Sequence, residues 1–264
     1  MKTSLDLTPH PGEMLKPREL IELHGTGPLT LQDRRVFNTL VENAWGPRLG
    51  QSGQWFEIDT GQLRSQTDRN TRLADSLTRL MRTICLVIKD DGKVELRTAL
   101  LSSNEIHTTT NGGKLRYKFT EELAELLKDS TIFAKLDLEV MRSFSSKYAF
   151  SLYEAVARRA RMKHRFTEEL DLEALREMLG VEEGRLTSYK NLNVRAIQPA
   201  VTEVNSITPY DVSIVPKKKG RKVVGFVMGW NMKSEEDMKA AYAEMHRHSV
   251  GRRQRLDGTE EGDV

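Results

Sequence analysis

Two stretches of the sequence show the same order of predicted elements: a helix, a short strand, two further helices and a β-hairpin. In the first stretch the helix has a capping signal, and glycine-containing turns join the strands. In the second stretch an amphipathic helix precedes two strands that are joined by a basic turn. This repeated order predicts an α+β fold of two tandem winged-helix domains, each a helix-turn-helix followed by a β-hairpin wing.

The expected domain boundaries follow the prolines and the repeated element order. Residues 1–28 hold four of the eight prolines and are expected to form a flexible N-terminal arm. Residues 29–132 are expected to form the first winged-helix domain, and residues 133–232 the second. Residues 233–264 are expected to be helical at first and then disordered.

The first domain is expected to begin with a helix capped by Thr30 and Asp33, which have capping-box spacing, and ended by Gly46-Pro47. An apolar stripe at helical spacing predicts another helix, formed around Leu73, Leu77, Leu80, Met81 and Ile84. The remaining elements are expected to be a strand at 55–58, a short helix at 60–66, strands at 84–89 and 94–100, two strands meeting at 111–113 and a helix at 121–128.

The single cysteine, Cys85, lies in an apolar run and is expected to be buried in a strand. One cysteine excludes an internal disulfide and a cysteine-rich zinc site. No stretch reaches the roughly 18 consecutive apolar residues of a membrane span. The N-terminus also lacks the pattern of a secretory signal. The sequence therefore predicts a cytoplasmic protein without membrane contact.

The second domain is expected to contain a helix-turn-helix. Its predicted elements are a long helix at 139–161, an extended piece at 164–166, a helix at 171–179 ended by Gly180, a helix at 188–205 and strands at 210–216 and 222–230. Pro199 is expected to kink or divide the helix at 188–205, because proline lacks the backbone N–H that continues a helix. Its first half is then expected to present side chains to bases, and its second half to anchor the core.

The helix at 188–205 carries side chains that are suited to reading DNA bases. One helical face holds Asn191, Arg195, Gln198 and Thr202, with Val194 on the same side and Lys190 beside them. Arg forms paired hydrogen bonds with guanine and Asn or Gln with adenine, while an apolar side chain contacts the thymine methyl group. The alternative interpretation is an ordinary solvated face of an amphipathic helix.

The predicted wing of the second domain is strongly basic. Between Arg185 and Lys233, nine Lys and Arg residues face two acidic residues, a net charge of +7, against +3 for the whole chain. The wing contributes Lys217, Lys218, Lys219, Arg221 and Lys222. Such a wing next to a base-reading helix predicts contacts with double-stranded DNA through its phosphates.

The first domain is nearly neutral, with sixteen basic and fifteen acidic residues over positions 29–137. Its third helix is expected to present a polar face formed by Arg72, Ser76 and Arg79, with Arg69 nearby. This face is interpreted either as an auxiliary DNA contact or as an ordinary solvated surface. The small net charge of this domain, and its strands beyond those of a minimal winged helix, are also compatible with dimerisation through it.

No motif predicts catalysis, a metal or a cofactor. Gly112-Gly113-Lys114 fails the phosphate-loop pattern, because Thr108 stands where glycine is required and Leu115 follows the lysine. His246 and His248 flank an arginine in a helical context, unlike the paired histidines of nicking enzymes. The other histidines are scattered without ligand spacing.

Three segments of the second domain resemble the initiator replication proteins of iteron-containing plasmids. These segments are Ser146–Glu154, the stretch Pro199-Ala200-Val201-Thr202-Glu203-Val204-Asn205 and the wing Lys219–Val223. In the first domain the resemblance extends to the element order and to Leu29–Leu40. It covers about residues 29–232.

The resemblance implies a protein that binds direct repeats at a replication origin, promotes opening of adjacent DNA and recruits the host initiator and replicative helicase. It also implies no ATPase activity, and dimers, formed through the first domain, that repress the initiator's own promoter while monomers start replication. A winged-helix transcriptional regulator is the alternative, although no segment is left over for an effector domain. A nicking enzyme is a third class, which would require a metal and a nucleophile that the sequence does not cluster.

Overall fold

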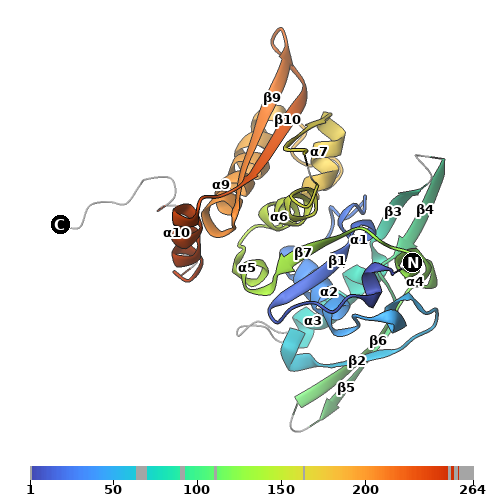
Figure 1. The fold of residues 1–264 in the computed structure, drawn as a ribbon. Coiled ribbons are helices and arrows are strands. Elements are labelled where there is room, and N and C mark those ends of the chain that lie inside the picture. Colours follow the sequence, from blue (N-terminus) through green and yellow to red (C-terminus); the bar gives the residue numbers. More distant parts are fainter. Residues whose placement is uncertain are drawn as a thin grey trace. The chain divides into compact units, whose positions relative to one another are not determined.

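The computed structural model describes residues 2–63, 70–89, 93–109, 112–162, 164–248, 251–252 and 255. The chain divides into two compact units, Met1–Lys135 and Leu136–Val264 (Figure 1). This division lies three residues beyond the boundary expected from the sequence. The predicted turn at 90–92, the tip at 110–111 and the last residues of the helix predicted at 60–66 lie outside the described residues.

Unit 1 is built around two helices that the sequence predicted. Helix α2 (Leu31–Asn43) begins with the predicted capping box, in which Thr30 and Asp33 exchange side-chain and backbone hydrogen bonds. Helix α3 (Asn70–Arg82) buries Leu73, Leu77 and Leu80. The prediction that Met81 and Ile84 complete its apolar stripe was wrong, because the helix ends at Arg82 and both side chains are exposed.

The strands of unit 1 form small antiparallel sheets. One contains β2 (Phe56–Asp59), β6 (Gly112–Phe119) and β5 (Leu101–Thr109) in that spatial order, and another pairs β3 (Ile84–Lys89) with β4 (Val94–Ala99). Cys85 of β3 is buried, as predicted. The short helices η2 (Pro47–Gly50) and η3 (Thr60–Leu63) and helix α4 (Glu121–Lys128) complete the unit.

The N-terminal residues are not the flexible arm that the prolines suggested. They form η1 (Ser4–Asp6), strand β1 (Glu13–Pro17) and helix α1 (Arg18–Ile21), and β1 pairs with β7 (Phe133–Asp137). The apolar side chains Leu5, Met14, Leu15, Leu20 and Leu23 are buried. Pro17 is tolerated at the end of β1, where a two-stranded sheet needs few backbone donors.

Unit 2 begins with two helices where one long helix was predicted. Helix α5 (Leu138–Ser143) ends, and helix α6 (Lys147–Arg159) starts after the N-cap residue Ser146. The backbone N–H groups of Ser145 and Ser146 donate to the carboxylate of Glu203, so they are not available to continue a helix. A long-range hydrogen-bond acceptor therefore causes the break, which local sequence does not reveal.

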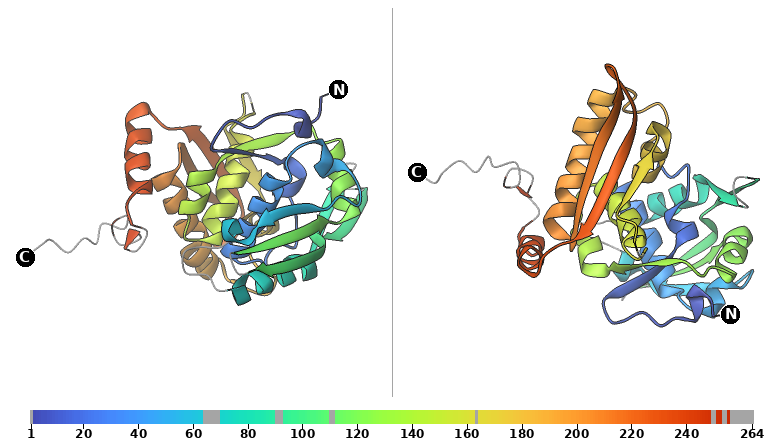
Figure 2. Two further views of the ribbon diagram at one scale, coloured as in Figure 1. Left: turned by 90° about the horizontal axis from the view of Figure 1, so that it is seen from below. Right: turned by 45° about the horizontal axis from the view of Figure 1, so that its top comes forward.

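The remaining elements of unit 2 form a three-stranded sheet packed against helices. The sheet has the order β8 (Thr167–Leu170), β10 (Lys222–Met232), β9 (Tyr210–Lys219). Helix α7 (Leu172–Leu179) follows β8 in the chain and precedes the helix predicted at 188–205, and α10 (Glu235–Met245) follows the sheet. Helix α9 (Gln198–Ile207) lies along the β9–β10 hairpin, which begins just after this helix ends (Figure 2). This hairpin is the predicted wing.

A buried ion pair joins the two main helices of unit 1. Arg79 donates from Nε and Nη2 to the two carboxylate oxygens of Asp33, at 2.7 and 2.9 Å. Asp33 is fully buried, whereas the side chain of Arg79 is 39% exposed. Burial by itself would raise the pKa of Asp33, but the hydrogen bonds from Arg79 and Thr30 lower it below its ordinary value. Arg79 therefore stabilises the unit by compensating a buried charge.

Replacing Arg79 with alanine is expected to lower the free energy of unfolding by about 2 kcal/mol at neutral pH, because a buried carboxylate loses its partner and Arg79 itself is partly solvated. The control Arg82→Ala, on an exposed position of the same helix, is expected to change it by under about 0.5 kcal/mol. Urea unfolding followed by circular dichroism measures both.

The pH dependence follows from the sign of the shift. A lowered pKa in the folded state means that Asp33 contributes stability above its unfolded pKa, and this contribution is lost as pH falls through the folded value. The difference between wild type and Arg79→Ala should therefore shrink below about pH 4. A difference that is constant from pH 7 to pH 3 would contradict a charge-based role.

Candidate nucleic-acid interface

The turn between the two helices of the helix-turn-helix is fixed by a buried arginine. Helix α7 starts at the N-cap Asp171, whose side chain accepts from Ala174 N at 2.7 Å, and ends at Gly180 with φ +66°. Arg176 then donates to the carbonyl oxygens of Leu186 and Arg185 at 3.0 and 2.7 Å. These hydrogen bonds set the position at which the next helix begins.

The helix predicted at 188–205, called the recognition helix from here on, is interrupted, as Pro199 led us to expect. It consists of α8 (Tyr189–Leu192), the π-helical segment η5 (Asn193–Ile197) and α9. The backbone N–H of Gln198 donates to Asn193 O, one residue further back than in an α-helix. Because Pro199 has no N–H, the wider turn forms directly before it. The interruption shifts which side chains share a face.

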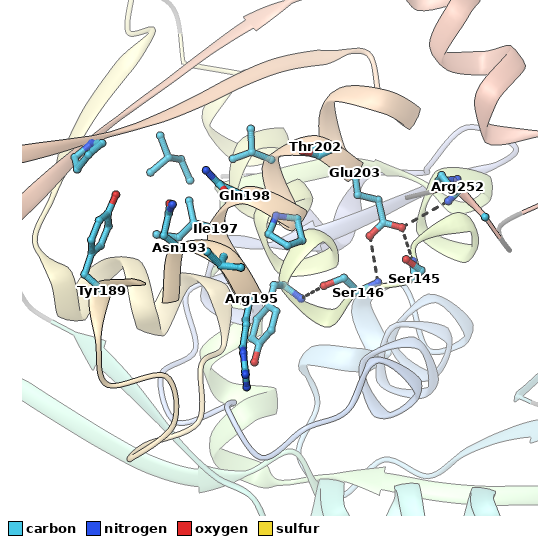
Figure 3. Close-up of a pocket in the computed structure, with 17 residues that line it drawn as sticks. Ser145, Ser146, Tyr189, Asn193, Arg195, Ile197, Gln198, Thr202, Glu203 and Arg252 are labelled. Atoms are coloured by element: carbon cyan, nitrogen blue, oxygen red, sulfur yellow. Dashed lines mark hydrogen bonds and ion pairs between the residues drawn. The ribbon is translucent and has the colours of Figure 1, made fainter. Parts of the chain in front are cut away.

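An open groove of about 870 Å³ runs along this helix (Figure 3). Four predicted contact residues line it, namely Val194, Arg195, Gln198 and Thr202. Strand β9 contributes Ile214 and Pro216 to the lining. The structure thus brings most of the predicted base-reading face into one groove next to the wing.

Two predicted residues and two missed ones show the effect of the π turn. Lys190 and Asn191 are exposed but do not line the groove, whereas Tyr189 and Asn193 do. A regular α-helical register places Asn191 on the face of Arg195, and the extra residue of the π turn brings Asn193 there instead. Pro199 was the sequence signal for this change. It predicted that the helix is interrupted, but not that the interruption is a π turn with one extra residue.

Two residues of the Pro-Ala-x-x-Glu-x-Asn stretch hold the recognition helix in place. Glu203 is buried and accepts from Ser145 N at 2.6 Å and Ser146 N at 3.2 Å. Asn205 donates to Val212 O at 2.9 Å and accepts from Val212 N at 2.8 Å, which fixes the start of the wing. These side chains position the interface and do not form its surface.

The wing is a tight hairpin in which four of the five basic residues lie on strands and Arg221 lies in the turn. Lys219 pairs with Lys222 across Gly220, whose φ is +63°, and Arg221. Lys217 Nζ is bonded to Glu169 Oε2 at 2.7 Å, so its charge is partly neutralised. Alternation along β9 places Lys218 on the same face as Pro216 of the groove. The five predicted wing residues are therefore not equivalent.

The polar face predicted in unit 1 was only partly correct. Ser76 is completely buried, so its assignment as a DNA contact was wrong. Arg79 is bound to Asp33, Arg72 is exposed, and Arg69 lies outside the described residues. Asp33 on α2 binds Arg79, so this side of α3 packs against the core. The spacing of residues within α3 alone could not predict a partner on another helix.

Within the described part of the chain, no three His, Cys, Asp or Glu side chains converge as a metal site would require. In the same residues, no helix combines the length and apolar character needed to cross a membrane.

Comparison with known proteins gives matches in both units. A family model described as "Initiator Replication protein, WH1" matches residues 13–157, and one described as "Initiator Rep protein, WH2" matches residues 171–230. A curated relative, "Replication initiation protein" of Escherichia coli, is 30% identical over 135 residues, which are 48% of this chain and 42% of the relative. The aligned part thus spans less than half of that relative.

A solved structure shares the fold. "Crystal structure of Pi initiator protein in complex with iteron DNA" matches with a TM-score of 0.57 at 18% identity, over 85% of this chain and 98% of that chain. Together with the WH1 and WH2 matches, this likeness confirms the predicted fold of two winged-helix domains. The first family model alone spans more than half of the sequence. The chain belongs to the initiator replication protein family.

Proposed function

We propose that this protein initiates plasmid replication by binding directly repeated DNA sequences, iterons, through unit 2. The observation that carries the proposal is the groove that presents Arg195, Gln198 and Thr202 beside a basic wing. An α-helix fits the major groove of B-DNA, and the Arg and Gln side chains of this helix can form paired hydrogen bonds with guanine and adenine. The structure described as the Pi initiator bound to iteron DNA supports the choice of ligand.

Each part of unit 2 has a separate task in this proposal. Arg195 and Gln198 contact base edges, Val194 contacts a thymine methyl group, and Asn193 replaces Asn191 as the reading amide. Lys190 and Asn191, exposed at the start of the helix, bind backbone phosphates. Lys218, Lys219, Arg221 and Lys222 of the wing supply further phosphate contacts, with Arg72 of unit 1 as an auxiliary contact.

The later steps of initiation are proposed from family membership. Bound copies promote opening of adjacent DNA and recruit the host initiator and replicative helicase, with no catalytic step by this chain. As a dimer, the protein represses its own promoter. A winged-helix regulator would bind DNA equally well, but its binding sites would not support replication of a plasmid that carries them.

Unit 1 offers a surface for the proposed dimer. In the described residues β4 pairs only with β3, and this hairpin exposes the apolar side chains Ile84, Ile88 and Val94. An open strand edge with exposed β-branched residues is a ready surface for pairing with a second copy. A symmetric pair fits inverted repeats at a promoter, whereas a monomer fits direct repeats.

Arg195→Ala is expected to weaken binding to the preferred duplex by ~1–3 kcal/mol and to relax preference at one base pair, because a bidentate pair of hydrogen bonds to one base is removed. Arg195→Lys keeps the charge but not the forked geometry, so it should lose the same preference while binding random DNA normally. Titration of duplexes selected from a random library measures both. Equal losses on selected and random duplexes would show that Arg195 contacts only phosphate.

The joint variant Lys218→Ala/Lys219→Ala is expected to weaken binding to all sequences. It should reduce the slope of log K against log salt by ~0.9 for each phosphate that the variant no longer neutralises. Lys217→Ala is the matched control and should change the slope less, because Glu169 already pairs with Lys217. Fluorescence anisotropy between low and moderate salt gives the slopes, and a slope unchanged in the joint variant would place the wing away from DNA.

Ile88→Lys is expected to shift the protein toward monomer, because a charge at the hairpin surface opposes strand pairing. Val215→Lys, at an exposed valine of unit 2, is the control and should leave self-association unchanged. Sedimentation velocity across a concentration range compares the two with wild type. Dimerisation that survives Ile88→Lys would move the interface elsewhere.

A further inference from the structure

The C-terminal segment returns to the DNA-binding groove after leaving the wing. The WH2 family match ends at residue 230, and α10 follows with its N-cap Ser234 and the buried side chains Ala241 and Met245. Beyond α10, Gly251 and Arg252 line the same groove as Gln198 and Thr202. Residues outside the family match therefore form part of the proposed interface.

Arg252 is buried and connects three helices. Its Nη1 donates to Ser143 O, at the end of α5, at 2.7 Å, and its Nη2 to Met245 O, at the end of α10, at 3.4 Å. The same guanidinium lies 3.6 Å from Glu203 Oε1 on α9 and 3.7 Å from Glu244 Oε1. Only 4% of Arg252 is exposed, so its charge is used inside the unit. The C-terminus of a helix attracts cations, and the contacts with Ser143 O and Met245 O are both at helix C-termini.

Glu203 relays this contact to the DNA-binding surface. Its carboxylate holds the backbone N–H groups that precede α6, and it follows Thr202 directly on α9 (Figure 3). A buried carboxylate needs compensation by a cation and by hydrogen bonds. Without Arg252, Glu203 would retain two N–H donors but lose the nearby positive charge. This loss would favour movement of the Glu203 carboxylate toward solvent. Such movement would displace Thr202 and Gln198 together.

We propose that Arg252 is a positioning residue for sequence recognition: it fixes Glu203, and through Glu203 the orientation of the recognition helix. The proposal rests on the function proposed above, because it assumes that unit 2 reads DNA. It assigns a role to the segment after the wing, which the family matches do not include. Arg252 is too buried to be counted among the phosphate contacts.

The experiment compares Arg252→Ala with Arg255→Ala in the full chain. Arg255 belongs to the same segment and donates to Glu244 Oε1 at 2.7 Å and His248 O at 3.0 Å, which lie in or just after α10 and not on the recognition helix. Wild-type protein first selects a preferred duplex from a random library. Affinities for that duplex and for a random duplex are then measured over a range of salt concentrations, with thermal unfolding followed in parallel.

Arg252→Ala is expected to bind the selected duplex about tenfold more weakly, which corresponds to about 1.4 kcal/mol, while affinity for random DNA and the salt slope stay at wild-type values. Arg255→Ala should stay within about twofold of wild type. A salt slope lowered by ~0.9 would show a direct phosphate contact and overturn the positioning role. Wild-type preference in Arg252→Ala, or an equal loss in Arg255→Ala, would also overturn it.

Two further variants keep the test decisive if Arg252→Ala unfolds. Arg252→Lys retains the charge with fewer donors, so it should fold and lose part of the preference. The pair Glu203→Gln/Arg252→Lys should lose no more than the stronger single variant, because both changes act on one interaction. Additive losses would contradict the relay. If wild-type protein selects no sequence, the proposed function fails first, and that outcome is distinct from the failures above.

Discussion

The architecture of unit 2 depends on the hydrogen bonds that the buried carboxylate of Glu203 accepts. This carboxylate binds the N–H groups of Ser145 and Ser146, so it ends the preceding helix and starts α6. It also projects from α9, which makes the recognition helix and the loop before α6 one rigid assembly. A negative charge in this position needs the guanidinium of Arg252 nearby. The contacts of Glu203 and Arg252 thus help to shape the groove that both residues line.

Pro199 gives the same helix its unusual surface. The missing N–H is accommodated by a π turn, in which Asn193 is partly exposed and Val194 and Arg195 are exposed. Asn205 then ties the helix to the base of the wing through two hydrogen bonds with Val212. In the Pro-Ala-x-x-Glu-x-Asn stretch, the proline thus interrupts the helix, the glutamate binds the loop before α6, and the asparagine binds the start of β9. Preorganisation of this kind lowers the ordering cost of binding.

Much of the fold was predictable from local signals, because caps, glycine turns and apolar periodicity are properties of neighbouring residues. The capping box of Thr30 and Asp33 and the stop at Gly180 are examples. What was missed depends on distant partners: Ser76 is buried beside the Asp33–Arg79 pair, and the break before α6 requires Glu203. The sequence predicted that Arg195, Gln198 and Thr202 share one face, and the structure places all three in the groove. That Asn193 lines the groove and Asn191 does not follows from a π turn, which regular helical periodicity does not predict.

Hydroxyl-radical footprinting on the DNA that flanks the gene tests the central claim most directly, because it reads position, polarity and spacing in one measurement. The account predicts protections that repeat with the same polarity at a constant interval of about two helical turns, or roughly 21 base pairs. Each protected site should be occupied through unit 2, so Arg195→Ala should erase the pattern at concentrations where wild type gives it. Protection without a regular interval, or a regular pattern that persists in Arg195→Ala, would contradict sequence-specific recognition of direct repeats by this groove.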